Sequence, residues 1–140
     1  MDLTLNLKPF MSWATAQADI EGVALVGSYA RGTATENSDV DLMILTSERA
    51  RYLENQDWLS LFGEIERSRN ETWGAVKTIR ATYKTGLEIE YNFSTPSWAA
   101  VPVDAGTRRV VNDGLKILFD PIGILDALRN AVIAEGSAIS

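Results

Sequence analysis

The 140-residue chain contains no cysteine and no histidine. Without cysteine it can form no disulfide and has no thiol chemistry. The lack of histidine removes the commonest general base and the commonest zinc ligand among protein side chains. Any catalysis by this chain must therefore rest on carboxylates, lysine, arginine or a bound metal ion.

Positive charge is scarce as well. The sequence has 13 Lys and Arg against 19 Asp and Glu, which gives a formal net charge of −6. Binding of nucleic acid without sequence preference requires a basic stripe or patch. The charge balance therefore argues against nucleic acid as a partner, while a nucleotide or a cationic small molecule stays open as a substrate.

Long apolar runs and targeting signals are also missing. No stretch reaches the roughly 20 apolar residues that span a membrane. The first ten residues lack the basic start and the apolar run of a signal peptide. We therefore expect a cytoplasmic protein with no membrane partner, and the length predicts one domain over residues 1–140.

Hydrophobic periodicity predicts both strands and helices. Apolar runs and strict alternation indicate strands at residues 22–26, 39–45, 76–84, 87–93 and 116–119. Helical spacing indicates helices at residues 9–18, 28–33, 47–53, 58–65, 106–112 and 123–134. Between the predicted elements at 58–65 and 76–84, Asn70 and Gly74 interrupt the pattern.

The segment that can carry chemistry is residues 27–42, which read GSYARGTATENSDVDL. A Gly-Ser turn follows an apolar strand, and Asp39 and Asp41 open the next strand. Strand side chains alternate, so these two aspartates point to the same side. Paired carboxylates repel each other unless a cation lies between them. Hard oxygen ligands of this kind suit Mg²⁺.

This segment resembles the signature of the nucleotidyltransferase superfamily, which includes DNA polymerase beta, the aminoglycoside adenylyltransferases and the minimal nucleotidyltransferases. The matching positions are Gly27, Ser28, Ala30, Arg31, Gly32, Ser38, Asp39, Asp41 and Leu42. The resemblance is strong over residues 22–46 and looser over residues 76–93. It implies the nucleotidyltransferase fold, of class α/β (α+β), with a mixed β-sheet and helices packed mainly on one face.

The resemblance also implies roles for the residues of the signature. Gly27 lets a triphosphate approach the backbone, and Ser28 offers a hydroxyl to it. Arg31 reaches phosphate in one interpretation and is a surface arginine in the other. Asp39 and Asp41 would ligate two Mg²⁺ ions together with the nucleotide.

The family places a third carboxylate on a neighbouring strand, and both Glu88 and Glu90 lie on one face of the strand at 87–93. We favour Glu88, which directly follows the first apolar residue of that strand. The predicted catalytic and metal-binding set is therefore Asp39, Asp41 and Glu88. Glu90 is the alternative or accessory carboxylate, and it could instead bind a cationic acceptor. Arg80, in the middle of a strand, could equally form a structural ion pair with these acids.

The function implied is Mg²⁺-dependent transfer of a nucleoside monophosphate, AMP from ATP, to a hydroxyl of a small-molecule or protein acceptor. An alternative is an antitoxin-like interaction module that binds or adenylylates a helical toxin partner. A homodimer could also complete the site for a small acceptor. The four tryptophans are expected in the core or in partner contacts rather than as base-stacking platforms, with Trp98 bordering the acceptor site.

Overall fold

The structure is a computed structural model that describes residues 3–33, 39–100 and 102–139. Its elements, in chain order, are α1 (Leu3–Thr15), β1 (Ile20–Val26), α2 (Ser28–Arg31), β2 (Val40–Thr46), α3 (Arg49–Glu54), η1 (Asp57–Phe62), β3 (Ile65–Trp73), β4 (Val76–Tyr83), β5 (Glu88–Ser94), η2 (Pro96–Ala99), α4 (Ala105–Asp113), β6 (Leu115–Phe119) and α5 (Ile124–Ile139). The elements η1 and η2 are 3₁₀-helices.

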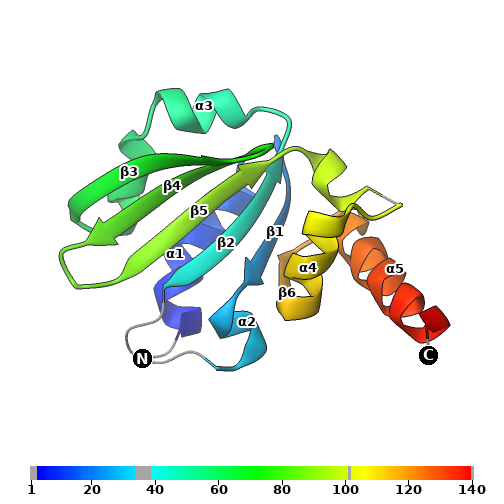
Figure 1. The fold of residues 1–140 in the computed structure, drawn as a ribbon. Helices are drawn as coiled ribbons and strands as arrows, with labels where there is room; N and C mark the ends of the chain where they lie inside the picture. Colours follow the sequence, from blue (N-terminus) through cyan, green and yellow to red (C-terminus); the bar gives the residue numbers. More distant parts are fainter. Residues whose placement is uncertain (1–2, 34–38, 101, 140) are drawn as a thin grey trace.

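The strands form one six-stranded sheet in the order β3-β4-β5-β2-β1-β6 (Figure 1). The central pair, β2 and β5, is parallel, and all other neighbouring strands are antiparallel. The expectation of a mixed sheet is therefore confirmed. Parallel pairing brings the starts of β2 and β5 to the same edge of the sheet, where both strands carry acidic residues.

One face of the sheet packs against α1, α3 and η1. Apolar residues from these elements and from β1, β2, β4 and β5 form the larger core cluster, which includes Phe10, Tyr52, Trp58, Tyr91 and Phe93. Aromatic rings fill much of this layer. Trp13 stacks on Trp58 with ring centroids 5.0 Å apart, and Tyr52 stacks on Phe93 at 5.4 Å.

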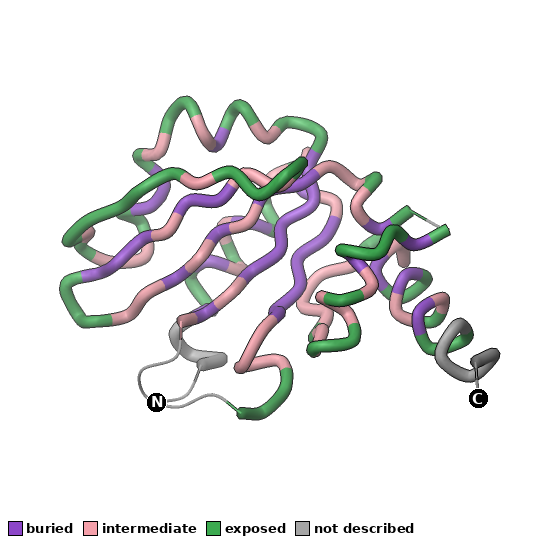
Figure 2. Tube along the Cα trace, in the orientation of Figure 1, coloured by how far each residue is buried: buried purple, intermediate pink, exposed green. Residues whose placement is uncertain are grey.

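The second face is only partly covered. Residues of β1 and β2, including Ala24, Val26 and Met43, pack there against α5, with side chains of α4 and η2 at the margin. Helices thus lie on both faces, with the larger core on the face covered by α1, α3 and η1. The central strands appear as a buried band in Figure 2, and β3 is exposed along most of its length.

Two segments depart from the predicted elements. The helix α1 begins at Leu3, so Pro9 lies inside it rather than at its start. Residues 58–65 do not form one helix, because η1 ends at Phe62 and β3 begins at Ile65. The strand β3 was not predicted, and it is an edge strand with mostly exposed side chains on both faces, so it has no apolar alternation.

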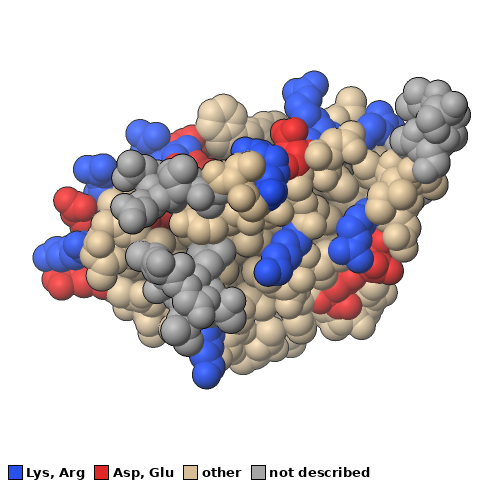
Figure 3. Space-filling model, turned by 90° about the horizontal axis from the view of Figure 1, so that it is seen from below, with Lys and Arg blue, Asp and Glu red and all other residues tan. Residues whose placement is uncertain are grey.

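Over the described residues, no helix is long and apolar enough to cross a membrane. Figure 3 views the molecule from below, and Lys and Arg side chains are scattered there among acidic ones. Over the described part of that face they do not form a continuous basic stripe.

Candidate active site

Two aspartates and two glutamates meet at the start of the parallel strand pair. The register places Asp41 directly beside Glu90, and Val40 beside Ile89. Since alternate residues share a face, Asp39, Asp41, Glu88 and Glu90 all lie on the partly covered face. The structure therefore brings all the carboxylates predicted from the sequence into one cluster.

Asp41 is the most perturbed of these acids. Burial, then the hydrogen bond and negative charge of Glu90, then the charge of Asp39 together raise its pKa to about 8. Its Oδ1 atom is buried and has no hydrogen-bond partner among the described residues. A buried acceptor without a donor is costly, so this oxygen is suited to a cation.

Asp39 and Glu88 form the second pair, at the outer end of the cluster. The pKa of Glu88 is raised, first by its hydrogen bond with Asp39 and then by burial and the charge of Asp39. Asp39 and Glu88 are less enclosed than Asp41 and Glu90. The Glu88 side chain is 30% exposed, whereas that of Glu90 is 17% exposed. Each aspartate thus has its own glutamate neighbour.

Arg80 of β4 is the cation within this cluster. It pairs with Glu90, its Nη1 donates to Asp39 Oδ2 at 3.2 Å, and the same nitrogen lies 3.7 Å from Glu88 Oε1. Its Nε donates to Glu71 Oε1 of β3 at 3.0 Å. The hydrogen bond from Arg80 holds the pKa of Glu71 below its usual range. Arg80 therefore bridges the acids at the start of β2 and on β5, and it anchors itself to a third strand, β3.

The Gly-Ser turn lies against the same cluster. β1 ends at Val26, which pairs with Asp41, and Gly27 follows with φ 76° and ψ −152°. A Cβ on Gly27 would lie 2.6 Å from Asp41 Oδ2, so no other residue fits without displacing that carboxylate. The helix α2 has only one turn, so its free amides rather than a macrodipole would favour an anion.

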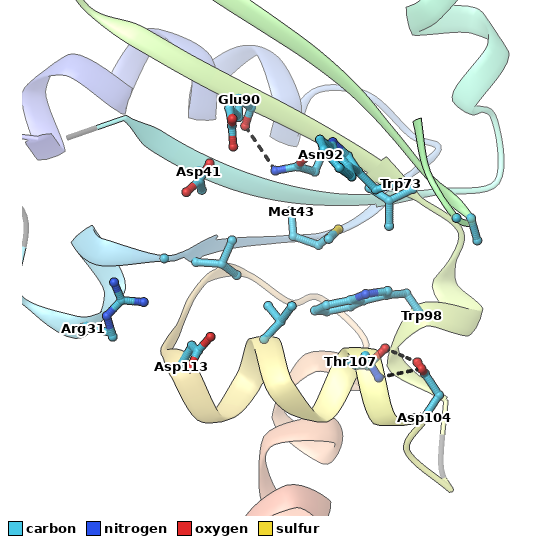
Figure 4. Close-up of a pocket in the computed structure, with 17 residues that line it drawn as sticks. Arg31, Asp41, Met43, Trp73, Glu90, Asn92, Trp98, Asp104, Thr107 and Asp113 are labelled. Atoms are coloured by element: carbon cyan, nitrogen blue, oxygen red, sulfur yellow. Dashed lines mark hydrogen bonds between the residues drawn. The ribbon is translucent and has the colours of Figure 1, made fainter. Parts of the chain in front are cut away.

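A pocket of about 630 Å³ contains part of this cluster (Figure 4). Asp41 and Glu90 lie within its lining, together with Gly27 and Arg31 of the signature. From there the pocket extends past Met43 and Asn92 toward Trp73, Trp98 and α4. Asp39 and Glu88 do not line it, and Ser38 lies outside the described residues.

The residues fit a divalent cation, although the described residues contain no ready-made group of three ligands around one point. The donor set consists of carboxylates, the preferred ligands of Mg²⁺. The repulsion within the cluster and the orphaned Asp41 Oδ1 both favour a bound cation. In the present arrangement Arg80 supplies the neutralising charge.

Comparison with known proteins agrees with this geometry. A sequence model described as the nucleotidyltransferase domain matches residues 8–89, which is more than half of the chain. The chain belongs to the nucleotidyltransferase domain family. No curated protein shows significant similarity to it.

Two of the solved structures that share the fold of this nucleotidyltransferase domain illustrate the similarity. An aminoglycoside 6-adenyltransferase from Bacillus subtilis superposes with a TM-score of 0.53 at 16% identity, over 69% of this chain and 35% of that one. A nucleotidyltransferase-like protein from Exiguobacterium sibiricum gives a TM-score of 0.50 at 15% identity, over 94% of this chain and 38% of that one. The similar part is thus little more than a third of either of those chains.

Sequence reasoning missed two residues that support the site. Glu71 anchors Arg80, but it lies on β3, which has no apolar pattern to reveal it. Gly114 follows α4 with φ 137°, and a Cβ there would lie 2.8 Å from Arg31 Cγ and 3.1 Å from Arg31 N. This glycine allows α2 to pack closely beside β6. The sequence alone does not show that these two elements are neighbours.

Proposed function

We propose that this nucleotidyltransferase transfers a nucleoside monophosphate, AMP from ATP, to a hydroxyl of an acceptor in a Mg²⁺-dependent reaction. The observation that carries the proposal is the Asp41–Glu90 pair, with its orphaned buried oxygen, directly against the Gly27 turn. ATP as the donor is supported by the adenyltransferase named among the structures that share the fold.

In this reaction the acceptor oxygen attacks the α-phosphorus of the nucleotide. A new O–P bond forms, the bond to the β-phosphate oxygen breaks, and pyrophosphate leaves. Divalent ions held by these carboxylates would neutralise the entering and leaving oxygens of the displacement. We assign to the chain the binding of phosphates by Gly27, Ser28 and Arg31.

The metal-binding residues of the proposal are Asp39 and Asp41, with a third carboxylate from Glu88 or Glu90. The third carboxylate also takes the proton of the acceptor hydroxyl, as a general base within reach of that oxygen. The sequence favoured Glu88 for this role. The register supports Glu90, because it lies beside Asp41 and lines the same pocket.

The test measures pyrophosphate release and transfer of label from α-labelled ATP to a panel of small-molecule and protein acceptors, with and without Mg²⁺. Asp39→Ala and Asp41→Ala should each remove nearly all activity while circular dichroism shows a retained fold. If both variants stay as active as the parent protein, the metal assignment is wrong.

The alternative function, an interaction module for a helical toxin partner, makes the opposite prediction. Binding of that partner would then be stoichiometric and would survive both aspartate substitutions. A homodimer that completes the acceptor site would instead show activity that depends on protein concentration. The activity assay, run over a range of protein concentrations, tests the homodimer, and binding of the partner to the two aspartate variants tests the interaction module.

A further inference from the structure

The pocket that contains Asp41 and Glu90 has an aromatic end. Trp73, at the turn between β3 and β4, and Trp98, from η2, line that end of the pocket. Met43 and Val110 contribute apolar surface between them. In Figure 4 the Trp73 and Trp98 side chains lie above and below the pocket, and the Met43 side chain lies between them in that view.

The two indoles are held by different supports. Trp98 is partly buried and packs against the core cluster that includes side chains of α5. Trp73 is 62% exposed, but its hairpin is attached to α3, because Arg49 donates a hydrogen bond to the carbonyl oxygen of Ala75. The exposed indole of Trp73 can therefore stack on a ligand without leaving any contact in the core.

The polar side chains at this end are already engaged with the protein. Asn92 Oδ1 accepts from Thr78 Oγ1 at 2.6 Å, and Asn92 Nδ2 donates to the carbonyl of Leu42 at 3.0 Å. The Asp104 carboxylate accepts from the Gly106 amide and from the Thr107 hydroxyl. The surface left for a ligand is therefore mainly ring faces and apolar atoms, which suits a flat aromatic group.

We propose that the Trp73–Trp98 end of the pocket is the nucleobase subsite of the enzyme. This inference rests on the proposed function. It assigns one end of the pocket to the phosphates and the other end to the base. With the phosphates at Gly27 and Arg31 and the α-phosphate at Asp41, the nucleoside must continue along β2. Two residues of strand cover about 7 Å, so Met43 lies about one ribose length beyond Asp41.

The direction of attack places the acceptor away from the aromatic end of the pocket. An in-line displacement requires the acceptor opposite the leaving pyrophosphate. The turn that would hold the pyrophosphate follows β1, on one side of β2, whereas Glu88 and Glu90 lie on β5, on the other side. The acceptor therefore approaches over β5, and the aromatic end of the pocket is left to the base. The inference thus departs from the expectations drawn from the sequence, in which the tryptophans were not base-stacking platforms and Trp98 bordered the acceptor site.

Stacking also determines the selectivity that this subsite gives. Ring faces accept any base, and larger rings bury more area. We therefore expect ATP and GTP to bind with similar affinity, and both to bind more tightly than CTP and UTP. A site that read the base through hydrogen bonds would instead separate ATP from GTP strongly.

The experiment compares two ligands, Mg²⁺-ATP and Mg²⁺-tripolyphosphate, which has the phosphates but no base. Trp73→Ala and Trp98→Leu should each weaken ATP binding by about tenfold, which is within the range for loss of one base–aromatic contact. Binding of tripolyphosphate should not change. Leu61→Ala is the matched control, because Leu61 is also 62% exposed but lies on η1, at the other face of the sheet.

Trp98→Phe keeps an aromatic face, and it serves in place of Trp98→Leu if that variant does not fold. It should retain most of the ATP affinity. Unchanged ATP affinity in folded Trp73→Ala and Trp98→Leu would overturn the inference, as would an equal loss of tripolyphosphate binding. If the parent protein binds neither ligand, the proposed function itself fails, and the subsite fails with it.

Tryptophan fluorescence gives an independent readout. Trp13 and Trp58 stack on each other in the layer on the opposite face, so a stacked base should quench only the emission of Trp73 and Trp98. ATP should quench the parent protein, and the Trp73→Phe/Trp98→Phe double variant should show no quenching. Quenching that persists in the double variant would place the base elsewhere.

Discussion

Gly27 lies directly against the carboxylate of Asp41, and a Cβ added to Gly27 would be 2.6 Å from Asp41 Oδ2. The contact arises because Val26, the preceding residue, pairs with Asp41 across β1 and β2. The phosphate-binding turn and the metal-binding aspartate of the proposed site are therefore in contact. Any side chain added at Gly27 must therefore displace the Asp41 carboxylate.

Gly27→Ala should abolish activity while leaving a folded protein. The new methyl group would push the Asp41 carboxylate away from its place, and misplacing a reacting group by about 1 Å can reduce the rate by about 100-fold. The backbone adds strain, because φ at Gly27 is 76°. We expect at least a 100-fold loss of pyrophosphate release at saturating ATP.

Gly32→Ala is the matched control for that variant. Gly32 has the same φ of 76°, but a Cβ there would meet no atom within 4 Å. It should share the backbone strain, about 1 kcal/mol of stability, without the clash. Equal losses of activity in the two variants would show that the backbone, and not the contact with Asp41, is what matters at Gly27.

The sequence predicted the central part of this arrangement because the strands concerned have strong patterns. The strands β1 and β2 are continuous apolar runs, and β5 alternates strictly, so their positions and the shared face of the acids could be predicted. The Gly-Ser turn and the paired aspartates then gave the family, which the match over residues 8–89 confirms.

The remaining features depend on relations that no single segment contains. The pairing of Asp41 with Glu90 is a property of register, which the sequence of either strand alone does not specify. The strand β3 is stabilised by pairing with β4 rather than by an apolar face, so Glu71 and its bond to Arg80 could not be predicted. The position of Trp73 beside the pocket depends on the same unpredicted hairpin.

The stability of the metal-free protein should fall as the pH rises. The pKa of Asp41 is about 8 in the folded protein, against a usual value of 3.8, so the folded state holds the proton more tightly than the unfolded state. The stabilisation is therefore complete below about pH 4 and is lost as the pH rises through 8. Urea unfolding in EDTA should give a lower free energy of unfolding at pH 9 than at pH 6.

Asp41→Asn removes the titrating group and should flatten this dependence. Mg²⁺ should stabilise the parent protein more at pH 9 than at pH 6, because the ion binds the deprotonated carboxylate. The assignment to Asp41 is wrong if the parent and Asp41→Asn lose the same stability between these pH values in EDTA.

Separate substitution of the two glutamates should identify the third carboxylate. Glu90 lies beside Asp41, is 17% exposed and lines the pocket, whereas Glu88 lies beside Asp39 and is 30% exposed. We expect Glu90→Gln to lower kcat by at least 100-fold, the range for loss of a general base, with little change in KM for ATP. Glu88→Gln should have the smaller effect, and the reverse order would assign the role to Glu88.

Arg80→Met should make the free energy of unfolding depend more strongly on Mg²⁺. The substitution keeps most of the side-chain length but removes the cation that pairs with Asp39, Glu71 and Glu90, so the carboxylates would repel one another. In EDTA we expect a loss of about 2 kcal/mol in the free energy of unfolding, and Mg²⁺ should restore more of it than it adds to the parent protein.

Arg69→Met is the matched control for Arg80, because Arg69 also donates to Glu71 but is 69% exposed and contacts none of the site carboxylates. An exposed ion pair contributes less than about 1 kcal/mol, so this variant should keep the stability and the Mg²⁺ response of the parent. If Arg80→Met gains no extra stabilisation from Mg²⁺ over Arg69→Met, the cation of Arg80 and the bound ion do not neutralise the same carboxylates. In that case Arg80 would be a structural ion pair that is independent of the metal.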